Sequence, residues 1–200
     1  MKRVCLDLCA GLGGLSEAFV RSPNWEVIRI DNNELLSDVP HMRIADITQL
    51  DPRAFSDADV ILAGPTCTDF SMAYSAPRSV AWREGIRGSD YKPDMTLVRT
   101  VQNWISIIKP DHWLIENVNG SQEFFRKVRL YPSMKHGPFV LYGTWPRFSM
   151  PREWRHSKFD GDTWSSDPLR ANRRGKIPLE LSRAILESLE GCVTLERWTS

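Results

Sequence analysis

Two short stretches of the sequence carry side chains that could do covalent chemistry. In "GPTCTDFS", residues 64–71, Cys67 follows the apolar run 60–63 and lies between a proline and a polar turn. Backbone amides of this turn and the start of a following helix could lower the pKa of the thiol and expose its thiolate. The alternative is a small apolar filler, as free cysteines usually are. We favour a nucleophile, because Cys67 lies beyond the expected strand rather than inside it.

The second stretch is "IENVNG", in which Glu116 ends the apolar strand "WLI". A buried carboxylate is costly unless it is paired or functional. Desolvation would raise the pKa of Glu116 and make it a usable acid near neutral pH. The alternative is a structural carboxylate that accepts hydrogen bonds from the amides of the turn.

A glycine-rich turn, "DLCAGLGG", follows the first apolar run of the chain. Gly11, Gly13 and Gly14 would let a ligand approach the backbone closely, and the following helix start favours a carboxylate or phosphate. The spacing is not that of the dinucleotide fingerprint, and the Lys-Ser/Thr pair of a phosphate loop is missing. Taken alone, this stretch is weak evidence for a ligand, and an ordinary tight turn is the alternative.

Two aspartates strengthen the case for a ligand at this turn. Asp31 ends the second expected strand, where a carboxylate can accept hydrogen bonds from a ribose diol. Asp46 ends the third, a suitable position for an adenine amino group. Each could instead cap the turn that follows it. One adenosyl ligand would use both carboxylates, and we therefore expect such a ligand.

The candidate residues follow expected strands, which would bring them to one edge of a sheet. Hydrophobic patterns predict helices near residues 15–22, 94–110 and 178–191, and strands near residues 3–11, 25–33, 42–47, 58–65, 112–120 and 138–145. Ser16 could cap the first helix, and residues 66–92 are expected to form a long loop. Strands that alternate with helices predict an α/β fold with a Rossmann-like, doubly wound, mostly parallel sheet. Ligands of such sheets bind beyond the carboxyl ends of the strands.

The bulk composition limits the class of protein. The 200 residues suffice for one domain with a sizeable core, and the net charge of +1 does not indicate a polyanion partner. Four cysteines show no metal-binding spacing, so we expect no metal site and a reducing, cytoplasmic setting. The apolar runs are far shorter than the roughly 18 residues that span a bilayer, and no membrane association is expected.

Together these motifs resemble the DNA cytosine-5 methyltransferase family. "DLCAGLGGLSEAF", "GPTCTDFS" and "IENV" have the order and spacing of its glycine-rich first motif, its nucleophile loop and its Glu-Asn-Val strand end. "GKIPLELSRAI", residues 175–185, resembles its last motif, which completes the cofactor pocket. The match covers most of residues 3–145 and 175–190. It implies the class I S-adenosylmethionine-dependent methyltransferase fold, with a catalytic domain formed by residues 1–145 and 175–200.

The resemblance implies S-adenosylmethionine as the methyl donor and DNA as the substrate. It implies that the Cys67 thiolate adds to C6 of cytosine, that Glu116 engages N3 and the amino group, and that Asn117 supports the Cys67 loop. A duplex substrate would need its target base flipped out, which costs roughly a few kcal/mol. The residues expected at the cofactor are Asp7, Cys9, Ala10, Gly11, Leu12, Gly13, Gly14, Asp31, Asn32, Asp46, Ile47 and Pro65. Those expected at the substrate are Thr66, Ser71, Arg83, Arg147 and Arg152.

The chain departs from the family pattern at several positions. Thr66 and Thr68 flank the cysteine, where the family usually has Pro before it and Gln or Glu after it. Cys9 stands where a Phe commonly lies against the adenine. The family's Gln-x-Arg-x-Arg segment is not found, and "MKHGPFVLYG" occupies its location, so Lys135 and His136 are the candidates to replace its arginine.

The largest departure is in size, because residues 146–174 are too short for the independent target-recognition domain of the family. Basic residues near aromatic ones suit phosphate contact and base stacking. The alternative is a solvated loop whose tryptophans pack on the domain. Residues 72–91, with Arg78, Arg83 and Arg87, could also close over the substrate. The basic and tryptophan side chains of the insertion and its flank are Arg147, Arg152, Arg155, Lys158, Arg170, Arg173, Arg174, Trp145, Trp154 and Trp164.

These features leave more than one functional class open. The leading hypothesis is methylation of cytosine C5 in DNA with short or relaxed sequence specificity, because few base-reading groups are available. The same chemistry on RNA or on a free cytosine nucleotide is the runner-up. A non-catalytic S-adenosylmethionine-binding subunit that needs a protein partner for target recognition is a third hypothesis, which the presence of both Cys67 and Glu116 disfavours.

Overall fold

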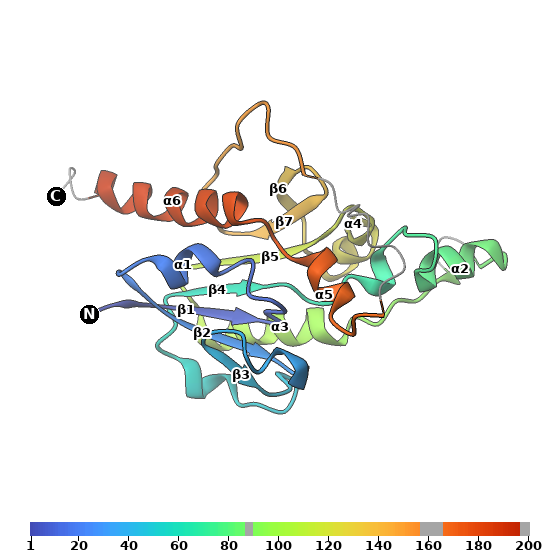
Figure 1. The fold of residues 1–200 in the computed structure, drawn as a ribbon, viewed down its shortest axis with the longest axis horizontal. Coiled ribbons are helices and arrows are strands. Elements are labelled where there is room, and N and C mark those ends of the chain that lie inside the picture. The colour runs from blue at the N-terminus through green and yellow to red at the C-terminus, as the bar shows by residue number, and fades with distance from the viewer. Residues whose placement is uncertain (87–89, 157–165, 197–200) are drawn as a thin grey trace.

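The structure, a computed structural model, describes residues 1–86, 90–156 and 166–196, with side chains up to residue 191. Within these residues, seven strands form one sheet in the order β3-β2-β1-β4-β5-β7-β6 (Figure 1). Strands β1 to β5 are parallel, and β7 is antiparallel to both of its neighbours. The strands are β1 Arg3–Leu8, β2 Trp25–Asp31, β3 Met42–Ile44, β4 Val60–Ala63, β5 His112–Val118, β6 Pro132–His136 and β7 Phe139–Gly143. The expected mostly parallel, doubly wound α/β fold is confirmed.

Helices connect the strands and cover both faces of the sheet. The α-helices of the described residues are α1 Glu17–Arg21, α2 Pro77–Arg83, α3 Thr96–Ile108, α4 Gln122–Phe125, α5 Arg170–Gly175 and α6 Leu179–Glu196. The short 3-10 helices are η1 Glu34–Leu36, η2 Pro52–Phe55, η3 Thr68–Phe70, η5 Asn119–Ser121 and η6 Arg126–Val128. None of the described helices is long and apolar enough to cross a membrane.

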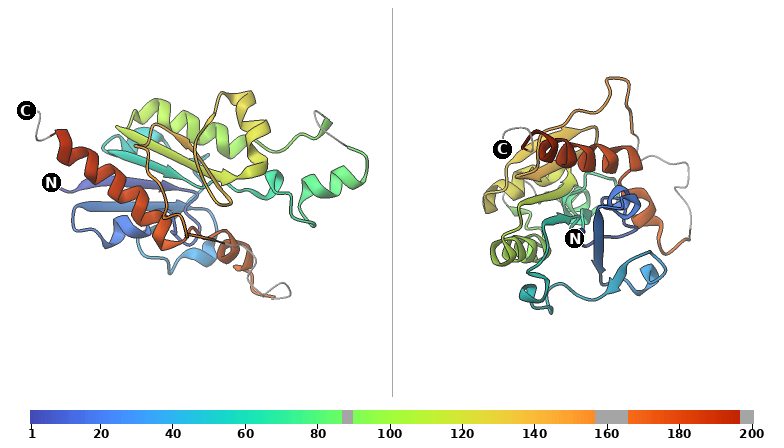
Figure 2. Two further views of the ribbon diagram at one scale, coloured as in Figure 1. Left: turned by 90° about the horizontal axis from the view of Figure 1, so that it is seen from above. Right: turned by 90° about the vertical axis from the view of Figure 1, so that its left-hand side faces the viewer.

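The central strands are apolar along their whole length because each face of the sheet packs on its own core. Alternate side chains of β1 and β4 enter a core against α3 or a second core against α1 and α6. Figure 2 shows α3 and α6 on opposite faces of the sheet. The continuous apolar runs that predicted these strands are therefore the sequence pattern of a sheet buried on both faces.

Helix α3 has the one-sided apolar pattern that its sequence predicts. Val98, Val101 and Trp104 are buried, and the indole Nε1 of Trp104 donates a hydrogen bond to the carbonyl oxygen of Ile47 at 3.2 Å. The helix ends where Lys109 takes a left-handed conformation with φ of 55°. This bond joins the helix to the segment after β3, which carries one wall of the site.

Several expectations about elements are wrong. The expected loop of residues 66–92 contains η3 and α2, and Pro77 occupies the first position of α2, where a proline is well tolerated. Strand β6 was not expected, because it is a partly buried edge strand without a continuous apolar run. Helix α6 continues past Gly191. Ser16 takes the cap position of α1 but makes no capping hydrogen bond.

Close backbone packing at the end of β7 holds the strand that carries Glu116. Residue Glu116 of β5 pairs with Leu141, and Leu114 pairs with Gly143. Gly143 has φ of 144°, and a Cβ atom there would lie 2.1 Å from the carbonyl oxygen of Trp113. The close approach of these two backbones requires a residue without a side chain.

We expect Gly143→Ala to lower the free energy of unfolding by about 2–4 kcal/mol, because it adds both a strained φ and a backbone clash. Urea unfolding followed by circular dichroism measures this change. The control is Gly191→Ala in α6, where a Cβ would meet nothing within 4 Å, and this change should stabilise by about 0.5–1 kcal/mol. Equal effects of the two substitutions would contradict the packing argument.

Candidate active site

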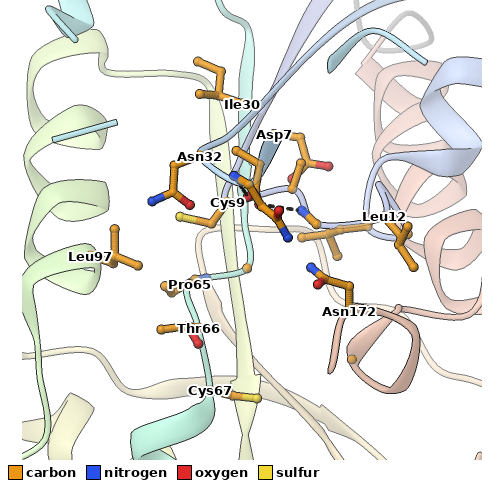
Figure 3. Close-up of a pocket in the computed structure, with 18 of the residues that line it drawn as sticks. Asp7, Cys9, Leu12, Ile30, Asn32, Pro65, Thr66, Cys67, Leu97 and Asn172 are labelled. Atoms are coloured by element: carbon orange, nitrogen blue, oxygen red, sulfur yellow. Dashed lines mark hydrogen bonds between the residues drawn. The ribbon is translucent and has the colours of Figure 1, made fainter. Parts of the chain in front are cut away.

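A cavity of about 350 Å³ opens at the carboxyl ends of the parallel strands, where β1 separates β2 from β4 (Figure 3). This is the position at which ligands bind in doubly wound sheets. Most of the residues expected from the sequence line it. They are Asp7, Cys9, Ala10, Gly11, Leu12, Gly14, Asp31, Asn32, Asp46, Ile47, Pro65, Thr66, Cys67 and Glu116.

The glycine turn after β1 forms the floor of the cavity with an unusual backbone. Gly11 and Gly13 have φ of 54° and 69°, and even Cys9 is left-handed with φ of 54°. Gly14 packs on the segment before α6, because a Cβ on it would lie 2.5 Å from the carbonyl oxygen of Ile177. The glycines therefore serve a specific close-packed turn and not a generic loop.

Gly13 does not line the cavity, although it was expected at the cofactor. Its would-be Cβ lies 2.3 Å from Cζ of Arg29, which is 3% exposed and fills the space behind the turn. Arg29 donates to the Gly13 carbonyl oxygen at 2.7 Å and to Ser16 Oγ at 2.8 Å. Gly13 thus makes room for a buried guanidinium that holds the turn.

Asp7 is a completely buried carboxylate behind the same turn. Its Oδ2 accepts a hydrogen bond from Ser16 Oγ at 2.6 Å, which explains why Ser16 does not cap α1. Its Oδ1 is buried without a hydrogen-bond partner among the described residues, and the residue lines the cavity. Burial raises the pKa of Asp7 from 3.8 to about 6, although Ser16 and Arg29 oppose the shift. An unsatisfied carboxylate oxygen beside a cavity suits a cationic group on a ligand.

Asp31 and Asp46 line the cavity and also bond to neighbouring turns. Asp31 accepts hydrogen bonds from the amides of Gly11 at 2.9 Å and Asn33 at 3.0 Å, and Asp46 accepts one from Thr48 at 2.8 Å. The capping and ligand-binding alternatives are therefore compatible, since a carboxylate can accept several hydrogen bonds. The bond to Gly11 fixes the turn against the end of β2.

The loop after β4 brings a cysteine to the mouth of the cavity. Pro65 is buried, and Cys67 is partly buried and lines the cavity together with Glu116. Asn117 is fully buried, and its Nδ2 donates to the Pro65 carbonyl oxygen at 2.9 Å. This bond joins Asn117 to the loop before Cys67, and the supporting role expected for Asn117 stays a prediction. The hydroxyls of Thr66 and Thr68, on either side of the cysteine, lie 3.2 Å apart.

Cys9 is a second thiol in the cavity, but its electrostatics differ from those of a nucleophile. Burial, with the nearby charges of Asp31 and Asp7, raises the pKa of Cys9 to about 12. Cys5, in the core, also has a pKa well above its usual value because it is buried. Both side chains remain neutral thiols at physiological pH, and thiolates are the reactive species. Of the cavity's two cysteines, Cys67 is the better candidate.

Several residues of the cavity were missed by sequence reasoning. Leu97 at the start of α3 and Asn172 in α5 contribute walls, and Figure 3 shows them on opposite sides of the cavity. Asn172 lies against the glycine turn, because a Cβ atom on Gly11 would be 3.5 Å from its Nδ2. Lys176 lines the cavity and pairs with Glu17 at 3.0 Å. No local motif predicts a site role for Asn172, because α5 reaches the cavity only by packing against the glycine turn.

Other expected residues lie elsewhere. Arg83 and Ser71 belong to the segment after η3 and do not line this cavity, and neither do Arg147 and Arg152, which are exposed. The candidates for the missing arginine also lie outside it: Lys135 Nζ donates to Asn119 Oδ1 at 3.0 Å, and the His136 ring stacks on Phe148 at 4.8 Å. Trp145 is buried, and Trp154 packs near Phe139. Arg87, Lys158 and Trp164 are outside the described residues.

The raised pKa of Asp7 has a consequence for stability. Because the pKa of Asp7 is higher in the folded state, the folded chain binds the proton of this carboxyl more tightly than the unfolded chain does. Protonation of Asp7 therefore stabilises the fold below pH 4, and this contribution is lost as the pH rises through 6. Asp7→Asn cannot ionise and should exceed the wild type in unfolding free energy by about 2–3 kcal/mol at pH 7.5. The difference should shrink toward zero at pH 4.

Urea unfolding between pH 4 and pH 8 checks this dependence. Asp38→Asn, at an exposed carboxylate, controls for the loss of one negative charge. An Asp7→Asn variant that is no more stable than the wild type at pH 7.5 would show that the carboxylate is not strained by burial.

Comparison with known proteins agrees with this geometry. A profile of the C-5 cytosine-specific DNA methylase family matches residues 4–128. The structure of the Entamoeba histolytica methyltransferase EhMeth aligns with a TM-score of 0.50 at 15% identity over 76% of this chain and 56% of that chain. A DNA modification methyltransferase encoded in an E. coli prophage aligns at 16% identity with a TM-score of 0.47, over 71% of this chain and 46% of that one. S. pombe Dnmt2 methyltransferase aligns at 17% identity with a TM-score of 0.44, over 72% and 49%.

The chain spans about half the length of these solved structures, and no curated protein matches it. At such low identity, the likeness to EhMeth shows the fold alone. The family profile is the stronger finding, because it covers well over half of the chain and includes both the glycine turn and strand β5, in which Glu116 lies. The chain therefore belongs to the C-5 cytosine-specific DNA methylase family, whose members are S-adenosylmethionine-dependent methyltransferases.

Proposed function

We propose that this chain transfers a methyl group from S-adenosylmethionine to C5 of cytosine in DNA, through a transient covalent bond to Cys67. One observation carries the proposal. Cys67 and Glu116 line the same cavity as the glycine turn and the carboxylates of Asp31 and Asp46. A nucleophile, an acid and a nucleoside-binding edge in one cavity are the parts that this reaction needs.

The residues present fit the proposed methyl donor. A cavity of about 350 Å³ is in the usual range for small-molecule sites. Asp31 and Asp46 would hold the ribose and the adenine amino group, and the buried Oδ1 of Asp7 would accept a hydrogen bond from the ammonium group. Cys9 and Asn32 would flank the adenine with less apolar area than an aromatic side chain provides.

The reaction follows from the roles of two side chains. The Cys67 thiolate forms a bond to C6 of cytosine, and the electrons of the C5–C6 double bond make C5 nucleophilic. Glu116 donates to N3 and accepts from the amino group, which stabilises the charge that develops on the ring. When bound, the cofactor would supply an electrophilic sulfonium methyl group to C5 and would leave as the thioether S-adenosylhomocysteine. Loss of the C5 proton then re-forms the double bond and expels the Cys67 thiolate.

A hydrogen bond from Asn117 restrains the loop that carries Cys67, and this restraint supports the same proposal. The family's usual proline before the cysteine is Thr66 here, which leaves the loop with one more rotatable backbone bond. The Asn117 bond to Pro65 restores part of this restraint from the neighbouring strand. Reactions of this kind depend on reacting atoms held near the attack distance.

The short insertion of residues 146–174 supports low sequence specificity for the target DNA. Residues 146–174 are the whole insertion, and its last part, α5, lines the cofactor side of the cavity. The described part of the insertion, residues 146–156 and 166–174, includes the exposed Arg147 and Arg152 but no strand or longer helix that could enter a groove as a unit. We therefore propose short or relaxed sequence specificity. A duplex target would have its cytosine flipped into the site.

Methyl transfer and covalent capture test the proposal together. The protein is incubated with methyl-labelled S-adenosylmethionine and duplex DNA, single-stranded DNA, tRNA or dCTP. We expect label in DNA and a loss of at least about a thousandfold in Cys67→Ser, because the nucleophile is removed. DNA with 5-fluorocytosine should stay bound to the wild-type chain on a denaturing gel, since fluorine cannot leave as a proton does.

Cys192→Ser is the matched control, because the proposal gives this cysteine no role, and it should retain transfer and capture. Label in RNA or dCTP alone would replace DNA by the runner-up substrates. Cofactor binding without label in any substrate would favour a non-catalytic subunit that needs a protein partner. Transfer to DNA that survives Cys67→Ser would exclude the covalent mechanism.

A second prediction concerns Asn172, which faces the cavity from the side opposite Asn32 and Leu97 (Figure 3). If the adenosine lies toward Asp31 and Asp46, Asn172 meets the amino-acid part of the cofactor. Asn172→Ala should then weaken binding of S-adenosylhomocysteine about tenfold, the cost of a hydrogen bond to a charged group. Binding of 5′-methylthioadenosine, which lacks the amino-acid part, should change less than about twofold.

Isothermal titration calorimetry with the two ligands measures this difference. Asp31→Asn is the comparison variant, because a residue at the ribose should weaken both ligands alike. Equal losses for both ligands in Asn172→Ala would move this side chain from the amino-acid part to the adenosine or to a purely structural role.

A further inference from the structure

An arm of the chain, residues 72–86, extends beyond the carboxyl ends of the strands. It carries α2, and both Figure 1 and Figure 2 show it reaching away from the rest of the molecule. None of the seven residues of α2 is buried. A helix this short does not persist on its own in water, so something else must hold or stabilise it.

The base of the arm is fixed to the domain. Arg78 donates to the Gly120 carbonyl oxygen at 2.8 Å and to Glu123 at 2.6 Å, and its guanidinium lies 4.9 Å from the ring centre of Phe124. Where the chain returns, the Tyr91 hydroxyl donates to the Asp69 carbonyl oxygen at 3.0 Å. Arg78 is therefore engaged in positioning the arm, and the outer part projects from a defined base.

The outer part of the arm concentrates exposed apolar side chains. Eight large hydrophobic residues are exposed in the described part of the chain, and four of them lie here: Met72, Tyr74, Trp82 and Ile86. Tyr74 is 80% exposed and Trp82 is 48% exposed. A concentration of this kind marks an interaction site more often than chance exposure.

Tyr74 and Arg83 form a stacked pair within this patch. The guanidinium lies 4.1 Å from the ring centre, and its Nη1 donates to the Tyr74 carbonyl oxygen at 2.9 Å. One ring face is thus backed by a cation while the residue stays largely exposed. A flat ring beside a fixed positive charge suits a nucleobase with its phosphate.

We propose that the arm is a stacking surface for unpaired nucleotides next to the target cytosine. This inference rests on the proposed function, because it takes the nucleic acid to be at Cys67. Tyr74 lies seven residues from Cys67, so the chain limits their separation to about 25 Å, a few nucleotides of extended strand. In an intact duplex, neighbouring bases cover both faces of each base, so unpaired bases are the ones whose faces are free to stack on protein rings.

The proposal also accounts for the short insertion. A stacking surface binds any base, because every base has a π face. It would add affinity that an insertion as short as residues 146–174 does not supply, without adding sequence specificity. The arm therefore predicts a preference for single-stranded or locally opened substrate over intact duplex.

Fluorescence anisotropy with a labelled, cytosine-free single-stranded DNA tests this surface apart from the chemistry. Tyr74→Ala and Trp82→Ala should each weaken binding about tenfold, and Tyr74→Leu should behave like Tyr74→Ala because it keeps apolar area without a flat ring. The salt dependence should be unchanged in these variants, whereas Arg83→Ala should lower the slope of log Kd against log salt by about one. Tyr131→Ala, at an aromatic that is 64% exposed before the edge strand β6, is the matched control and should bind normally.

The outcomes separate this inference from the proposed function. If the wild-type protein methylates DNA, but Tyr74→Ala and Trp82→Ala bind single-stranded DNA as tightly as the wild type does, the stacking surface is overturned and the proposed function stands. Arm-dependent binding without transfer to cytosine would leave the surface and overturn the function. Tighter binding of intact duplex than of single strands, or a dimer in sedimentation that these substitutions dissociate, would also overturn the proposal.

Discussion

The parallel pairing of β4 with β5 determines which side chains meet in the cavity. Ala63, the last residue of β4, lies opposite Ile115, so the chain leaves β4 beside the last residues of β5, which include Glu116. The Asn117 bond to the Pro65 carbonyl oxygen continues this pairing past the last ladder bond. This shared register helps to bring Cys67 and Glu116 to one cavity, although 49 positions separate them in the sequence. The proposed chemistry depends on this register more than on any single contact around the thiol.

A second constraint is the arrangement of charge behind the glycine turn. Arg29 is nearly buried and is held by oxygen atoms of Gly13, Ser16 and Pro40. It offsets part of the cost of burying Asp7, whose carboxylate is still hard to ionise. A folded chain that carries such an unsatisfied group gives up stability for a site that is ready for a cationic ligand. This exchange is common where a binding site is built in advance of its ligand.

The parts of the site that could be predicted from the sequence are those with a local cause. Asp31 and Glu116 lie in the last residues of β2 and β5, whereas Asp46 and Cys67 follow β3 and β4. Parallel strands gather all such positions at one edge. Asn172 could not be found in this way, because its place depends on how α5 packs against a turn 160 residues earlier in the chain. Similarly, Ser16 has the sequence of a helix cap, but a buried carboxylate takes its hydroxyl. Tertiary partners decide both cases, and strand patterns carry no information about them.

The contact between Gly14 and the backbone of Ile177 joins the glycine turn to the segment before α6, and Ser182 strengthens it by bonding to Leu15 and Ala18. During synthesis, the strands beside Cys67 leave the ribosome long before the segment that closes the far wall of the cavity. A nascent chain therefore passes through a stage in which the sheet can assemble while the donor pocket is still open on one side. The pocket closes only after residues 170–182 have been made, and a chain cut near residue 170 would keep Cys67 and lose the cavity wall that α5 provides.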